Sequence, residues 1–551
     1  MNQDVNIQER GEAVPPNKSL RYPKILLGMG FLLGWMLDFL FWGHEPGISV
    51  PLWIIQALTA LLILAFIEKV KPNRYSYGLI LLILAAAALT IFRLEPLTVC
   101  LNTIAALFGL ILLAATFADG HWVYYRLLDY VLPILRVIFG GLQRIRTVVF
   151  PSSRKLVSDA AGGKNGWKIF FSVLRGALFA LPILLILGSL LVSADEIFAN
   201  KLKFMMDWFS INNLVEYSFR MIFILLFSLI FVGVLIQALL PKKNNGKPDP
   251  TRRYFQPFLG WIETAMIIGS INLMFLLFVV IQFNYLFGGE TNIHFQGFNY
   301  AEYAQRGFSE LVAVAVLSFL IYLGLEAISR RETRSRLRWF SGLSILLMAQ
   351  VLVMLASSFQ RLALYEAAYG FTRLRMYTHV FIICLAVFLL VMMILEIAAI
   401  KGRFGLVFLL FCYSFAFALG LTNVDGMIAR LNLSHSTRPL LGNTLDYDYL
   451  RTLSMDAAGV LMTGFENEDL SRNSHEKIGA VFACRLHTIQ QMPETNWRSL
   501  RPVERLMDAR ILAMEGQLTA DFAVQETRDG VVIKTAKNEW SCAERWDDWM
   551  D

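Results

Sequence analysis

The sequence has few charged residues and few cysteines for its length. Of its 551 residues, 17% are charged and 5 are cysteine, whereas 56% are hydrophobic. An ordinary soluble domain carries roughly a quarter charged residues, so the low share indicates that much of the chain avoids water. The charge is missing mainly from long apolar runs, which is typical of a membrane protein.

The sequence also lacks the short motifs that carry common catalytic and cofactor chemistry. It contains no G-x-x-x-x-G-K-[S/T] loop, no H-E-x-x-H, no G-x-S-x-G and no C-x-x-C. Its 7 histidines are scattered without the spacing of metal ligands. We therefore predict no metal site and no cofactor, and no motif assigns an enzymatic activity.

Long apolar stretches predict an all-α polytopic membrane protein with about eleven transmembrane helices. A polar tail at residues 1–24 precedes them and is expected to be disordered in the cytoplasm. The predicted spans are 25–42, 50–67, 77–92, 97–117, 169–193, 217–240, 258–287, 308–328, 338–357, 377–399 and 403–421.

The basic residues of the loops give these spans a direction. Lys and Arg cluster after the even-numbered spans, as in 69–74, 242–253 and 330–338, whereas the intervening loops are mostly neutral or acidic by comparison. Because cytoplasmic loops carry the excess of positive charge, the N-terminus is expected inside and the C-terminus outside. A basic amphipathic stretch at about 122–150 is expected to lie in the cytoplasmic interface.

Residues 422–551 differ in charge from the rest of the chain. They hold 14 Lys and Arg and 20 Asp and Glu, a net charge of −6 against +13 for the remainder. Their pattern predicts a small α-rich extracytoplasmic domain with helices near 446–465, 474–491 and 502–516, and a short β-hairpin around 529–530. The basic residues of the membrane part lie in short loops, so we expect no nucleic-acid partner.

Two cysteines fall in this C-terminal domain, at Cys484 and Cys542, and the other three lie within predicted spans. An oxidising compartment permits a disulfide between Cys484 and Cys542. Two free thiols are the alternative, because sequence does not show whether the Cα atoms come within bonding range.

Polar and aromatic side chains gather where the spans meet the predicted outer interface. One interpretation is a structural belt of carboxylate–arginine pairs that fixes helix packing. The other is an outward-opening pocket in which carboxylates and arginines hold an anionic ligand. The candidate binding residues are Asp195, Tyr300, Glu302, Tyr303, Arg306, Glu310, Arg361, Tyr365, Tyr369, Thr372, Arg373, Arg375, Asp425 and Arg430.

Several of these segments resemble a known bacterial membrane family. The order and residue pattern of 193–195, 300–308, 361–375, 423–432 and 445–450 are similar to domain of unknown function 4173, which is related to domain of unknown function 4153. The resemblance implies a bacterial multi-pass protein of the plasma (inner) membrane and supplies no catalytic residues.

The expected role is envelope-related. The outer face would bind a ligand, a lipid headgroup or an envelope protein, and the C-terminal domain would act as a lid or docking module. Three alternatives remain open: a transporter of a small solute, a signalling scaffold, and a membrane enzyme acting on a lipid-linked substrate. The enzyme would need an outward acid or base, for which Asp195, Glu302 and Glu310 are the candidates.

Overall fold

A computed structural model describes most of the chain. The contacts divide it into two compact units, Met1–Phe39 with Arg136–Gln237, and Leu40–Leu135 with Ala238–Asp551. The described residues are 21–127, 129–130, 176, 180, 187, 191, 193, 195, 201, 214–240, 257–286, 308–330, 333–400, 402–436, 445–467, 470–491, 496–528, 530–535 and 537–542. Most of the expected N-terminal tail therefore lies outside them.

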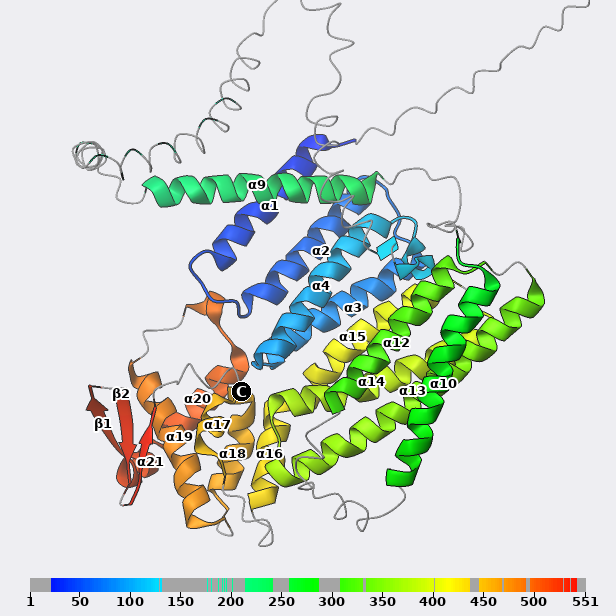
Figure 1. The fold of residues 1–551 in the computed structure, drawn as a ribbon. Coiled ribbons are helices and arrows are strands. Elements are labelled where there is room, and N and C mark those ends of the chain that lie inside the picture. The colour runs from blue at the N-terminus through cyan, green and yellow to red at the C-terminus, as the bar shows by residue number, and fades with distance from the viewer. Residues whose placement is uncertain are drawn as a thin grey trace, which may run out of the picture. The chain divides into compact units, whose positions relative to one another are not determined.

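Within the described residues, 10 helices are long and apolar enough to cross a membrane. They confirm the all-α polytopic class, and each coincides with a predicted span; the predicted span 169–193 lies almost entirely outside the described residues. The helices are α1 (Pro23–Phe41), α2 (Ser49–Ile67), α3 (Arg74–Phe92), α4 (Pro96–Thr116), α9 (Leu214–Leu239), α10 (Trp261–Leu286), α12 (Phe308–Ile328), α13 (Arg334–Tyr369), α14 (Arg373–Ile397) and α15 (Phe404–Thr422) (Figure 1).

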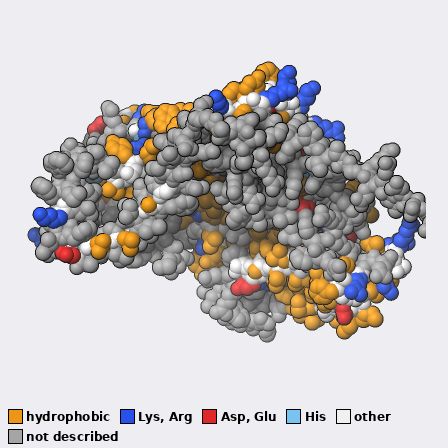
Figure 2. Space-filling view, turned by 90° about the horizontal axis from the view of Figure 1, so that it is seen from above, with side chains coloured by type: hydrophobic (Ala, Val, Ile, Leu, Met, Phe, Trp, Pro, Cys, Tyr) orange, Lys and Arg blue, Asp and Glu red, His pale blue; other side chains and the backbone are white. Residues whose placement is uncertain are grey.

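The surface of these helices suits lipid. Large apolar side chains such as Phe66, Leu81 and Ile262 are 86%, 69% and 73% exposed. Figure 2 shows hydrophobic side chains gathered into patches on the surface of the described part. A soluble protein rarely displays contiguous apolar area on this scale, whereas a bilayer covers it.

Helix α13 is longer than its predicted span of 338–357. It has 36 residues, about 54 Å at 1.5 Å per residue, against a hydrocarbon core of roughly 30 Å. It continues through polar residues because a helix needs only its own backbone hydrogen bonds, and it ends at Gly370, whose φ of 78° breaks the pattern. The apolar run therefore marked the bilayer crossing and missed the polar turns beyond it.

The structure describes only the beginning of the stretch predicted as an amphipathic helix at about 122–150. Residues His121–Tyr124 form a 3-10 helix, η1, and the chain is extended at Tyr125. Nearly all of the stretch beyond Tyr130 lies outside the described residues.

In the first unit, α1 and α9 pack closely through small residues. A Cβ added to Gly30 would come within 2.3 Å of Val232, and one added to Gly34 within 2.2 Å of Ser228. Near the end of α1, buried Asp38 accepts a 2.6 Å hydrogen bond from the guanidinium of Arg220 on α9. Ionisable groups at such depth usually pair in this way.

In the second unit, polar side chains inside the bundle join neighbouring helices. The amide of Asn272 on α10 donates to Leu343 O on α13 at 3.1 Å, and the Gln350 amide donates to Asn272 O at 3.1 Å. Ser357 also donates to Gln282. Such amides stabilise helix packing in lipid.

The two ends of this bundle differ. At one end, Asn73 N donates to Phe117 O at 3.0 Å, and the Arg403 guanidinium lies 5.4 Å from the Tyr124 ring. At the opposite end, the side chain of Arg93 donates to Gly420 O near the end of α15. The basic loop 69–74 belongs to the first of these ends, and the C-terminal domain is attached at the second.

The C-terminal residues form a helical layer and a small sheet. α19 is central and packs against α17, α18, α20, α21 and strands β1 and β2. Its buried residues include Ile478 and Phe482, which share one core with Ile511 and Ile533. The elements are α16 (Val424–Ser436), α17 (Tyr447–Thr452), η5 (Met455–Ala457), α18 (Ala458–Phe465), α19 (Arg472–Gln491), η6 (Trp497–Ser499), α20 (Pro502–Ala513), α21 (Glu515–Asp521), β1 (Ala523–Thr527), β2 (Gly530–Lys534) and β3 (Glu539–Ser541).

The structure refines the predicted secondary structure of this domain. The helix expected at 446–465 is three shorter elements, and the helix expected at 502–516 divides into α20 and α21. The predicted hairpin is present, with Thr527 paired to Gly530 in an antiparallel sheet of order β1-β2-β3. Helix α16 was not predicted, because it begins directly after a membrane span and its own sequence is polar. Strand β3 was not predicted, because it has only three residues.

Candidate functional site

A buried ion pair joins the membrane helices to the C-terminal domain. Arg373, the first residue of α14, donates from Nε and Nη2 to the two carboxylate oxygens of Asp425 at 2.8 and 2.7 Å. The Asp425 side chain is fully buried and that of Arg373 is 15% exposed. This two-pronged geometry is the strongest form of the arginine–carboxylate contact.

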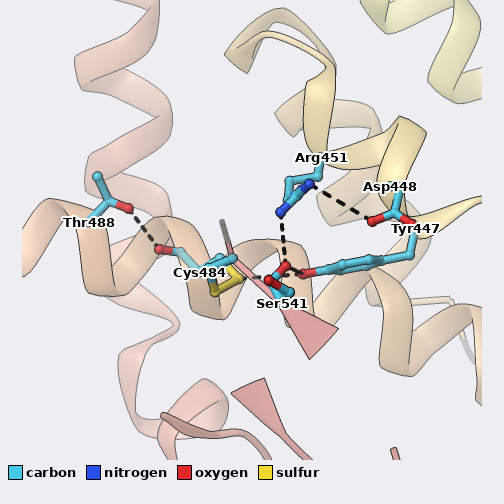
Figure 3. The surroundings of a disulfide bond; sticks show 7 residues. Tyr447, Asp448, Arg451, Cys484, Thr488 and Ser541 are labelled. Carbon is cyan, nitrogen blue, oxygen red and sulfur yellow. Dashed lines mark hydrogen bonds and ion pairs between the residues drawn. A yellow bond between two sulfur atoms is a disulfide. The ribbon is translucent and has the colours of Figure 1, made fainter. Parts of the chain in front are cut away.

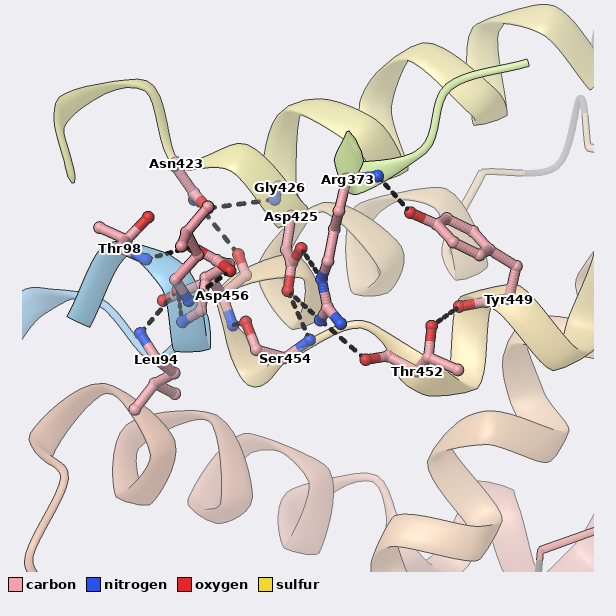
Figure 4. A network of polar contacts seen from close by, with 12 residues as sticks. Leu94, Thr98, Arg373, Asn423, Asp425, Gly426, Tyr449, Thr452, Ser454 and Asp456 are labelled. Atoms are coloured by element: carbon pink, nitrogen blue, oxygen red, sulfur yellow. Dashed lines mark hydrogen bonds and ion pairs between the residues drawn. The ribbon is translucent and has the colours of Figure 1, made fainter. Parts of the chain in front are cut away.

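Groups from the C-terminal domain form further hydrogen bonds with this pair (Figure 4). Ser454 N donates to Asp425 at 2.7 Å, and the Arg373 guanidinium donates to Thr452 O at 2.7 Å. The backbone N of Arg373 donates to the Tyr449 hydroxyl at 2.7 Å, and burial raises the pKa of Tyr449 to about 12. We call these five residues the clasp. Its charges are satisfied internally, as in the structural belt.

Beside the clasp, Asp456 holds the loop between α3 and α4. Its Oδ2 accepts from Leu94 N at 2.7 Å and from Glu95 N at 3.1 Å. Burial is the main influence on this carboxyl and raises its pKa above the ordinary value, against the lowering effect of the two backbone donors. Within the described residues its other oxygen, Oδ1, has no hydrogen-bond partner.

Glu95 caps α4 from the same loop. Its carboxylate accepts from Leu97 N and Thr98 N at 2.8 and 2.7 Å, and the Tyr377 hydroxyl of α14 also donates to it. A carboxylate at a helix N-terminus satisfies free backbone donors and interacts favourably with the helix dipole. Loop 93–95, α14 and the C-terminal domain therefore form one hydrogen-bonded junction.

A second group of residues forms a surface at the end of α13. Arg361, Tyr365 and Tyr369 recur every fourth residue and share a helix face. The Arg375 guanidinium of α14 lies 4.1 Å from the Tyr365 ring centroid, and Tyr365 packs against Tyr369 at 5.0 Å. Tyr369 is 54% exposed. We call Arg361, Tyr365, Tyr369 and Arg375 the tyrosine–arginine patch.

The turn beneath the patch is held rigidly. Asn432 of α16 accepts from Phe371 N at 2.8 Å and donates to Phe371 O at 2.9 Å. The Arg375 guanidinium donates to the carbonyl of Gly370. Because Gly370 has a φ of 78°, a side chain there would be strained.

A buried acid of α13, Glu366, contacts α14. Its carboxylate Oε1 forms a hydrogen bond with Nδ1 of His379 at 2.9 Å. The His379 ring also meets Phe359 edge to face at 4.5 Å. The Glu366–His379 contact thus joins α13 to α14.

The other predicted site residues are only partly described. Thr372 is the N-terminal flanking residue of α14, and Arg430 is exposed on α16. Glu310 is exposed on α12 and accepts from Ser309 at 2.9 Å, whereas Asp195 belongs to the first unit. The candidates Tyr300, Glu302, Tyr303 and Arg306 lie outside the described residues.

Cys484 and Cys542 form a disulfide with a Cα–Cα distance of 5.6 Å. Close to it, the Tyr447 hydroxyl and the Arg451 guanidinium each donate to Ser541 O at 3.0 Å (Figure 3). Helix α17 and the disulfide therefore hold strand β3 from two sides.

Sequence reasoning missed Glu95, Tyr377 and Asp456. Glu95 did carry a signal, because an acid directly before Pro96 at the start of an apolar run is typical of a helix N-terminus. No local pattern singles out Asp456, whose partners are more than 360 residues away. In the described part of the chain, no group of three or more His, Cys, Asp or Glu could hold a metal ion.

A family model supports the resemblance to the related family named in the sequence analysis. The model of a domain of unknown function, DUF4153, matches residues 79–463. This is the related family rather than domain of unknown function 4173. No curated protein and no solved structure matches the chain. Because the matched segment spans more than half of the chain and includes the clasp and the patch, the protein belongs to the DUF4153 family.

Proposed function

We propose that this protein is a bacterial plasma-membrane protein with an envelope-related binding role. In this proposal the C-terminal domain lies outside the cytoplasm, and the tyrosine–arginine patch binds a phosphate-bearing ligand at the outer interface. The ligand is the headgroup of an anionic lipid or a soluble phosphate compound.

The observation that carries the proposal is the stacking of Arg375 on Tyr365. An arginine 4.1 Å above a tyrosine ring is oriented before any ligand arrives, so less side-chain entropy is lost on binding. Its guanidinium fork matches the geometry of a phosphate. Arg361 lies one turn before Tyr365 on the same face of α13 and adds a second positive charge to the patch.

The contrast with Arg373 supports this assignment. Arg373 lies two residues from Arg375, yet its charge is neutralised by buried Asp425. The nearest acid of α13, Glu366, is directed to His379. The patch therefore combines positive charge with exposed aromatic surface, as headgroup-binding surfaces do.

The position of these arginines is also unusual for a membrane protein. Lys and Arg favour the cytoplasmic loops, yet Arg361 and Arg375 lie at the end of the bundle that carries the C-terminal domain. A role in binding gives a reason for their presence on the proposed outer side.

The test compares two alanine variants of the full-length protein in detergent. Arg375→Ala should weaken binding of a fluorescent short-chain phosphatidylglycerol roughly 10- to 100-fold, the range for losing a charged hydrogen bond. Arg338→Ala is the control, because Arg338 is an exposed arginine at the other end of α13. Equal affinity of both variants and the parent protein would refute the proposed site.

Competition then separates the two ligand sources. Displacement of the fluorescent lipid by inorganic phosphate at millimolar concentration would identify a soluble phosphate compound. Displacement by short-chain phosphatidylglycerol, with no effect of inorganic phosphate or phosphatidylcholine, would identify a lipid headgroup.

A further inference from the structure

Helix α20 separates its acidic residues from its basic and apolar ones. Glu504 and Asp508 both face the domain, where the Arg485 guanidinium of α19 binds them at 2.7 and 2.9 Å. The residues exposed on α20 are Arg505, Leu506, Ala509, Arg510, Leu512 and Ala513. The exposed face of α20 is thus basic and apolar, and none of its exposed residues is acidic.

Large apolar side chains on and next to this face are exposed. Leu506 is 55% exposed and Leu512 is 41% exposed, and Trp497, which precedes the helix, is 51% exposed. Tryptophan with leucine beside arginine is the composition of helices that lie in the headgroup layer of a membrane.

The start of α20 is anchored at the end of a transmembrane helix. Ile48 N, next to the first residue of α2, donates to Leu500 O at 2.9 Å. The approach is close, since a Cβ added to Gly47 would lie 2.7 Å from Leu500 O. Two residues later, Pro502 begins α20.

The body of α20 also lies beside the membrane part. It packs against α3 and against η5, whose Asp456 binds the loop directly after α3. The last residue of α3, Phe92, is 57% exposed, so α3 presents apolar surface at the end that adjoins the loop held by Asp456.

We propose that α20 and Trp497 form an interfacial anchor that inserts into the headgroup layer of the membrane spanned by this chain. The apolar side chains of Trp497, Leu506 and Leu512 enter the acyl boundary, and Arg505 and Arg510 bind the phosphates of anionic lipids. The occupant of this face is lipid, because its charge and its position beside α2 and α3 match a membrane surface. This anchor is separate from the tyrosine–arginine patch.

The test places an environment-sensitive dye on the helix. Cys100, Cys384 and Cys412 are replaced by alanine in the full-length protein, leaving the Cys484–Cys542 disulfide oxidised. A single cysteine is introduced as Leu506→Cys or, as the control, Gln517→Cys on the exposed surface of α21. Each is labelled with a nitrobenzoxadiazole dye and reconstituted in nanodiscs.

The dye at position 506 should emit at shorter wavelength than the dye at 517 and should be quenched by lipids that carry a spin label near the headgroup. In nanodiscs containing phosphatidylglycerol, Arg505→Glu with Arg510→Glu should reduce the quenched fraction at least twofold. Water-like, unquenched emission at both positions would overturn the proposal. A quenched fraction that changes neither with the charge of the lipid nor with the two arginine substitutions would also overturn it.

Discussion

Asp456 illustrates how a single residue of the junction couples stability to pH. Its carboxylate is 7% exposed and receives two backbone hydrogen bonds from residues 94 and 95. Burial nevertheless dominates and raises its pKa above the ordinary 3.8, because removing a carboxylate from water disfavours its charged form. The folded protein therefore holds this proton more tightly than the unfolded chain.

The sign of the pH dependence follows from that difference. The contribution of Asp456 to the free energy of unfolding is fully present below its unfolded pKa and is lost as pH rises through the higher folded pKa. Asp456→Asn should remove this pH-dependent loss of stability, because an amide does not titrate. The amide oxygen can still accept the hydrogen bonds from Leu94 N and Glu95 N. The difference in thermal midpoint, parent minus variant, should therefore fall as pH rises above about 4.

Thermal unfolding followed by intrinsic fluorescence from pH 4 to 8 measures this difference. Asp448→Asn is the matched control, because Asp448 is 63% exposed and lies 3.9 Å from Arg451. A parent-minus-variant difference that stays constant or grows with pH would contradict the account of Asp456.

At the residue scale, the sequence singled out the charged residues of the junction but did not predict which of them pair. Asp425 and Arg373 were both expected at the outer interface, and the structure joins them. They are 52 residues apart, so their contact depends on how α14 and α16 pack. The Arg375–Tyr365 contact could not be predicted from sequence either, because the two residues lie on different helices, α14 and α13.

At the scale of elements, the clasp fixes α14 and α16 to the loop between α17 and η5. Removing one partner of a buried ion pair leaves an unpaired charge and costs about 3–5 kcal/mol. Asp425→Ala should therefore lower the thermal midpoint and expose the C-terminal domain to proteolysis. Asp448→Asn, which removes an exposed carboxylate 3.9 Å from Arg451, should cost less than about 1 kcal/mol.

The double variant Arg373→Met with Asp425→Leu provides a further comparison. Replacing both charges with apolar side chains removes the unpaired buried charge, so it should recover a large part of the lost stability. If the double variant is less stable than Asp425→Ala alone, the hydrogen bonds to Ser454 and Thr452 contribute more than the ion pair.

Element boundaries were predictable where they coincide with the bilayer and not elsewhere. Apolar runs located all 10 described membrane helices, because burial in lipid requires about twenty apolar residues. They missed the polar extension of α13 and helix α16, since neither depends on lipid. In the C-terminal domain the helical positions were close, but Leu453 and Met514 interrupt what the pattern indicated as continuous helices.

For the whole molecule, the arrangement of the second unit bears on orientation. The basic loop 69–74 and Arg403 lie at one end of the bundle, and the C-terminal domain is attached at the other. Loop charge alone gave the same division from sequence. The Cys484–Cys542 disulfide is also of the kind that persists in an oxidising compartment, which agrees with an external domain.

Every functional proposal made for the chain rests on this proposed orientation, in which the patch and α20 lie on the outer side. Its most direct test uses single cysteines in full-length protein whose free cysteines at 100, 384 and 412 are alanine. Gln517→Cys reports on the C-terminal domain, and Lys71→Cys reports on the loop between α2 and α3.

The measurement is labelling by a membrane-impermeant maleimide in intact bacterial cells with a permeable outer envelope, compared with labelling after lysis. The account predicts that the cysteine at 517 is labelled in intact cells and that the cysteine at 71 is labelled only after lysis. Labelling of position 71 in intact cells, with position 517 protected until lysis, would contradict it.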